Sequence, residues 1–98
     1  MHARVATYGY TGDPHEIAKA AQEGMLPIFR EQSGFRAYSI ADMGGEIVSL
    51  SVWDSAEDAD AANRKAADWV AQNLAGSLEL KEARMGELLL STTLDVVP

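Results

Sequence analysis

Three stretches of the chain combine strand-forming residues with the alternation of side chains that a half-buried strand requires. They span residues 4–10, Phe35–Asp42 and Glu46–Trp53. A fourth strand is predicted over residues 84–93, around the run MGELLLSTT. Gly44-Gly45 lies between the second and third stretches and is typical of a two-residue hairpin turn, so these two strands are expected to pair antiparallel.

Two longer stretches change to the period of about 3.6 residues that indicates an amphipathic helix. The first, residues 14–32, follows Asp13, a residue type that caps helices, and begins with Pro14 at a position where its missing N–H costs nothing. Pro27 lies inside this pattern and predicts a kink or a break over residues 24–26. The second helix is expected to begin at Ala56, after the N-cap Ser55, and to end within residues 73–76.

The elements follow one another in the order β-α-β-β-α-β, which predicts a ferredoxin-like α+β fold. Because crossover connections are right-handed, both helices should lie on one face of a four-stranded antiparallel sheet. The length of 98 residues and the absence of a low-complexity linker indicate a single domain over residues 1–98.

The hairpin register places Tyr38 opposite Ser51 and Arg36 opposite Trp53. One face of the hairpin then carries aromatic and partly polar side chains, whereas the other carries small aliphatic ones. Small residues allow a helix to lie close, so we expect the helices to cover the small aliphatic face. The other face then needs a second copy of the chain to cover it, which predicts a homodimer. Its predicted interface residues are Arg36, Tyr38, Ile40, Ser49, Ser51 and Trp53.

Composition narrows the classes of partner. The chain has no cysteine and two histidines, which excludes disulfides and thiolate metal sites, and we expect neither a metal nor a cofactor. A net charge of −7 opposes binding to nucleic acid and to anionic membranes. No apolar run reaches the roughly 20 residues of a membrane span, and the N-terminal residues lack a signal-peptide core, so a cytoplasmic protein is expected.

Three segments resemble a known family. Residues 33–38 (SGFRAY), 50–59 (LSVWDSAEDA) and 86–91 (GELLLS) are similar to segments of antibiotic biosynthesis monooxygenase-like proteins, which are dimeric α+β barrels. The resemblance covers nearly the whole chain. It implies a homodimer whose two sheets face each other, and a small-molecule pocket in each protomer between the sheet and the helices.

The family also includes enzymes whose functional residues can be compared with this chain. Its cofactor-independent oxygenases act on polycyclic aromatic phenols and resemble one another in an Asn followed four residues later by Trp on the second helix. Here Asn63 is followed at that spacing by Ala67, and Trp69 lies six residues on. The haem-degrading members use a His late in the same helix, which has none here, so haem degradation of that type is disfavoured.

The resemblance leaves a cofactor-independent monooxygenase of a small aromatic or phenolic compound as the first functional hypothesis. Trp69 is the best candidate for stacking on such a ligand, although a Trp at a helix edge is commonly a packing residue. Asn63 could hydrogen-bond an enol or phenol, or could be a surface amide. Tyr8 could supply a phenolic proton, or could pack in the sheet.

Two further hypotheses remain open on the same fold. The departure from the Asn and Trp spacing favours a non-catalytic small-molecule-binding protein, and a closed gap between helices and sheet would favour a structural dimer. His15 is expected to be exposed in the first helical turn. No nucleophile and base, phosphate loop or carboxylate pair occurs at a diagnostic spacing, so the sequence assigns no catalytic residue.

Overall fold

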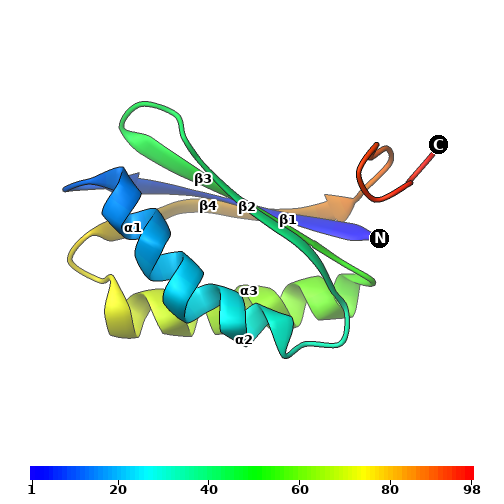
Figure 1. Ribbon diagram of the computed structural model, residues 1–98, viewed down its shortest axis with the longest axis horizontal. Coiled ribbons are helices and arrows are strands. Elements are labelled where there is room, and N and C mark those ends of the chain that lie inside the picture. Colours follow the sequence, from blue (N-terminus) through cyan, green and yellow to red (C-terminus); the bar gives the residue numbers. More distant parts are fainter.

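A computed structural model describes residues 1–98 as a four-stranded antiparallel sheet with helices against one of its faces (Figure 1). The strands lie in the spatial order β2-β3-β1-β4. Their bounds are β1 (His2–Tyr10), β2 (Phe35–Asp42), β3 (Glu46–Trp53) and β4 (Leu78–Glu87). The helical elements are α1 (Pro14–Ala20), η1 (Ala21–Met25), α2 (Leu26–Arg30) and α3 (Ala56–Asn73). The predicted ferredoxin-like α+β fold is therefore confirmed.

The first helical stretch contains a π-helical turn, η1, close to the predicted break. The N–H of Leu26 bonds to the carbonyl of Ala21, five residues earlier, and α2 then continues with Pro27 in its first turn. Proline has no N–H to donate, so the regular ladder is interrupted here. The turn brings Gly24 against α3, where an added Cβ would lie 2.6 Å from Cζ2 of Trp69.

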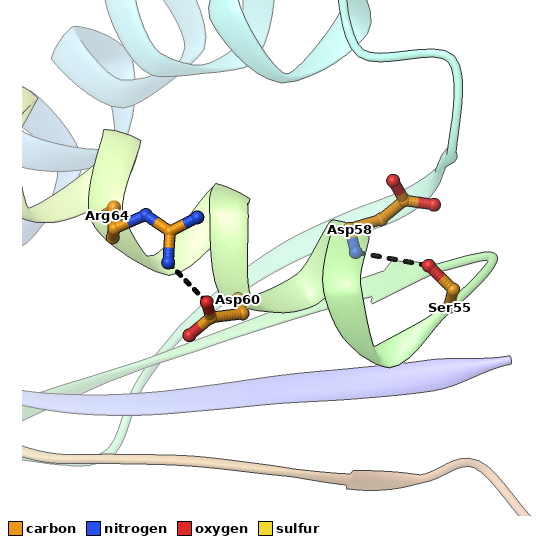
Figure 2. A network of polar contacts seen from close by, with 4 residues as sticks. All are labelled: Ser55, Asp58, Asp60 and Arg64. Carbon is orange, nitrogen blue, oxygen red and sulfur yellow. Dashed lines mark hydrogen bonds and ion pairs between the residues drawn. The ribbon is translucent and has the colours of Figure 1, made fainter.

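The start of α3 follows the predicted cap. Ser55 Oγ accepts a hydrogen bond from the N–H of Asp58 at 3.1 Å, and one turn further on Asp60 and Arg64 form an exposed ion pair (Figure 2). An exposed pair of this spacing contributes only a few tenths of a kcal/mol, about 0.3–0.5, so the helix is held mainly by its packed side. That side is a stripe of three buried alanines, Ala59, Ala62 and Ala66.

The helices cover the aromatic face of the β2–β3 hairpin, and the prediction that they cover the small aliphatic face is wrong. Phe29 of α2 is fully buried, with its ring centroid 5.0 Å from that of Tyr38 and 5.1 Å from that of Trp53. The alanines of α3 provide the small surface, which leaves room for large side chains from the sheet. Five predicted interface residues therefore lie beneath the helices: Tyr38, Ile40, Ser49, Ser51 and Trp53.

A β-bulge in β2 explains why Arg36 does not lie opposite Trp53. The register pairs Phe35 with Trp53 and Ala37 with Val52, so Arg36 has no partner on β3. Phe35 turns toward the core, and Arg36 forms a half-exposed ion pair with Asp54. Beyond the bulge, the predicted pairs Tyr38 with Ser51 and Ile40 with Ser49 are confirmed.

Strand β4 begins and ends six residues earlier than the predicted span of residues 84–93. Its bounds are set by β1, because Tyr10 pairs with Leu78 and His2 pairs with Glu87. The leucine run that suggested a strand centre lies beyond the N-terminal end of β1, so β1 has no residues left to pair with it. Leu89 and Leu90 are consequently exposed.

The contact between α2 and the aromatic face is tested by Phe29→Ala. Removing a fully buried phenyl ring is expected to lower the free energy of unfolding by about 3–5 kcal/mol. The control is Met43→Ala at the hairpin, where the side chain is 65% exposed and the change should stay within about 0.5 kcal/mol. Urea denaturation measures both, and equal stabilities would contradict this packing.

Candidate functional site

A mainly apolar cavity lies between the sheet and the helices. Its lining comes from all four strands and all helical elements, and its polar members are Arg4, Tyr8, Tyr38 and Ser49. The free space is about 30 Å³, enough for one or two water molecules. A flat aromatic ligand can therefore enter only if lining side chains move.

Arg4 is the one charged residue in this lining. It is 2% exposed, its Nε donates to Oδ1 of Asn63 at 2.8 Å, and its Nη2 donates to the hydroxyl of Tyr8 at 3.3 Å. Both partners are uncharged side chains, and none of the four ion pairs in the protein includes Arg4. Burying a cation without a carboxylate partner is costly, so this arrangement leaves an uncompensated positive charge at the cavity.

Tyr38 provides a neutral hydroxyl from β2, which is separated from β1 by β3. Burial raises the pKa of this hydroxyl to about 12, while a hydrogen bond with Ser49 and the charge of Arg4 act in the opposite direction. Because the hydroxyl keeps its proton at neutral pH, Tyr38 can donate a hydrogen bond but cannot serve as a base.

Trp69 closes the cavity from the side of α3. Its indole is half-buried, packs against the core and lies against the backbone of Gly24 in η1. Only a glycine in the π-helical turn allows this approach, since a methyl group there would collide with the indole. The first helix and α3 are thus joined at the residue that the sequence singled out for ligand stacking.

The structure brings the three predicted ligand-binding residues to one place. Tyr8 and Trp69 line the cavity, and Asn63 reaches it through the hydrogen bond to Arg4. Their roles stay predictions. Tyr10 is not part of this group, because its exposed hydroxyl donates to Asp42 at 3.0 Å outside the cavity. His15 is exposed in the first turn of α1, as expected.

Arg4 is the site residue that the sequence reasoning missed. It has the same parity along β1 as Ala6 and Tyr8, and all three are buried on the helix-covered face. A charged residue in phase with the buried side of a strand is unusual, and this phase was the available signal.

Other kinds of site are not found. No group of three or more His, Cys, Asp or Glu side chains is placed to hold a metal ion. None of the helices combines the length and the apolar character needed to cross a membrane.

The same fold occurs in several solved structures, among them an oxygenase and a proposed antibiotic biosynthesis monooxygenase. The cofactor-independent oxygenase SnoaB from Streptomyces nogalater superposes with a TM-score of 0.71 at 17% identity, over 93% of this chain and 95% of that one. HapK from Hahella chejuensis gives 0.70 at 13% identity, with the same coverages of 93% and 95%. A proposed antibiotic biosynthesis monooxygenase from Nitrosomonas europaea gives 0.69 at 19% identity, over 92% and 100%. No family model and no curated protein sequence matches the chain.

The raised pKa of Tyr38 predicts a loss of stability in alkali. Its hydroxyl titrates near 10 in the unfolded chain and near 12 in the fold, so above pH 10 the unfolded state releases a proton that the folded state retains. Stability therefore falls as pH rises through this window. Between pH 9 and pH 11 the wild type should lose about 1 kcal/mol more than Tyr38→Phe, measured by urea denaturation. Parallel pH profiles would contradict the assignment.

Proposed function

We propose that the protein is a cofactor-independent monooxygenase that acts on a small aromatic or phenolic compound. The observation that supports this best is the apolar cavity with hydrogen-bond donors gathered around Arg4. The solved oxygenase SnoaB shares the fold, which makes the same chemistry a consistent proposal for this chain.

The chemistry requires little from the protein beyond binding and charge stabilisation. An anthrone-type substrate loses a proton from its ring carbon, and the resulting anion supplies the electrons that reduce O₂. One oxygen atom forms a carbonyl at that carbon, whose two C–H bonds are broken, and the other leaves as water. Arg4 and the hydroxyls of Tyr8 and Tyr38 would stabilise the oxygen that carries the negative charge. The ring would occupy the apolar part of the cavity, stacked on a displaced Trp69.

A non-catalytic binding protein is the second candidate function. No carboxylate and no imidazole lines the cavity, so no side chain there is an obvious acceptor for the substrate proton. A protein that binds an aromatic compound without converting it would need the same cavity and no base.

The proposed assembly is a homodimer formed through the outer face of the sheet, the face opposite the helices. Figure 1 shows the helices together on one side, which leaves the outer face without helical cover. Val5 and Leu50 are paired neighbours there and are 39% and 38% exposed. Only 16 of the 98 residues are buried in a single copy, so a second copy would add substantially to a small core.

Turnover is tested by oxygen uptake in the presence of anthrone. The wild type should consume one O₂ per anthrone with saturable kinetics, and Asn63→Ala should lower kcat/KM by about tenfold or more because Arg4 loses the bond that orients it. Gln72→Ala, an exposed amide on the same helix, is the control and should match the wild type. Ligand-dependent thermal stabilisation without oxygen uptake would favour the binding protein. If anthrone neither binds to the protein nor causes oxygen uptake, both candidate functions are overturned.

The assembly is tested by Leu50→Glu. A carboxylate on the outer face would be buried against the second copy, so the variant should be a folded monomer at concentrations where the wild type is a dimer. Ala67→Glu, on the exposed side of α3, should remain dimeric. Light scattering gives the mass of each, and a monomeric wild type at micromolar concentration would contradict the proposal.

A further inference from the structure

No carboxylate in the protein forms an ion pair with Arg4. The chain carries a net charge of −7, yet its acidic residues leave this buried cation without an ion pair. A guanidinium cannot lose its proton at any ordinary pH, so the cost of burial cannot be avoided by neutralisation. The cavity is therefore a positively charged site inside an acidic protein.

The groups around Arg4 are neutral on every side. Asn63 approaches from α3, and Tyr8 lies four residues further along β1 on the same face of the sheet. Tyr38 and Ser49 line the cavity from β2 and β3. The residues of η1 and α2 that line the cavity are apolar, among them Met25 and Phe29. Two of the guanidinium nitrogens are engaged by Asn63 and Tyr8, which fixes the plane of the group beside the cavity.

We propose that Arg4 is a specificity-determining residue that selects an anionic ligand. The ligand class is a flat aromatic compound bearing a negatively charged oxygen, a carboxylate or a phenolate, which lies against the guanidinium while the ring fills the apolar part of the cavity. Guanidinium groups bind such oxygens through strong, directional hydrogen bonds. This inference rests on the proposed function only in requiring that the cavity accept an aromatic ring.

The alternative is that Arg4 only ties β1 to α3 through Asn63. A purely structural arginine would stabilise the fold without distinguishing charged from neutral ligands. The two roles are separated by binding selectivity, measured with probes that differ in charge and little else. Suitable probes are 2-naphthoate and its uncharged analogue 2-naphthamide.

The first experiment measures the dissociation constants of both probes by quenching of tryptophan fluorescence, since Trp69 lines the cavity. The wild type should bind naphthoate at least about tenfold more tightly than naphthamide, the effect expected of a charge-assisted hydrogen bond. Arg4→Met should abolish this preference. Arg36→Met is the matched control, because Arg36 pairs with Asp54 away from the cavity, and it should keep the preference.

A second measurement needs no variant and covers the case in which Arg4→Met does not fold. The neutral and anionic forms of 4-nitrophenol absorb at different wavelengths, so its pKa can be followed while it is bound to the wild type. The positive site should lower that pKa by about one unit or more, which corresponds to a tenfold preference for the phenolate. A lowered pKa without a naphthoate preference would assign a phenolate as the ligand, and the reverse would assign a carboxylate.

The outcomes separate this inference from the proposed function. Equal binding of naphthoate and naphthamide, together with an unshifted nitrophenol pKa, would overturn the role of Arg4 while leaving an aromatic-binding cavity. Failure of all three probes to bind would overturn the proposed function, and the inference with it.

Discussion

The structure depends on a complementarity of size between α3 and the sheet. Ala59, Ala62 and Ala66 allow the helix to lie close to the strands, and the large side chains of the interface come from the sheet and from α2. Phe29 is packed edge-on against Tyr38 and Trp53 in the space that the alanines leave. Exchanging the large and small residues between the layers would demand a different spacing of the helices, so this contact determines which sheet face is inside.

The same contact places the cavity. Where the alanine stripe ends, α3 continues with Trp69 and Val70, and Leu74 follows as its C-cap; all three line the free space. The indole of Trp69 fits only because the π-helical turn presents Gly24 to it. A local irregularity caused by Pro27 is thus connected to the candidate site, since both the turn and the glycine shape the wall that a ligand would have to displace.

The sequence predicted the elements well because their signals are local. Caps at Asp13 and Ser55 and the glycine turn at Gly44-Gly45 depend on neighbouring residues, and both side chains accept the expected backbone hydrogen bonds. The two glycines have φ angles of 80° and 94°, as the turn requires. Three predictions were wrong: the sheet face that the helices cover, the pairing of Arg36 with Trp53, and the limits of β4. Each of these features depends on contacts with another element and not on the local sequence. Alternation separates the two faces of a strand but does not say which one meets a helix.

The environment of Arg4 depends both on local sequence and on contacts with distant elements. Its parity on β1 is local and could have marked it as buried, but the absence of a carboxylate near it follows only from the assembled fold. A buried cation held by Asn63 and Tyr8 raises the free energy of the empty protein relative to an apolar lining of the same shape. An anion that enters the cavity would recover part of that cost, so the same residue would weaken the unliganded fold and strengthen binding. This coupling is the physical reason to look for function at Arg4 and not only at the aromatic residues around it.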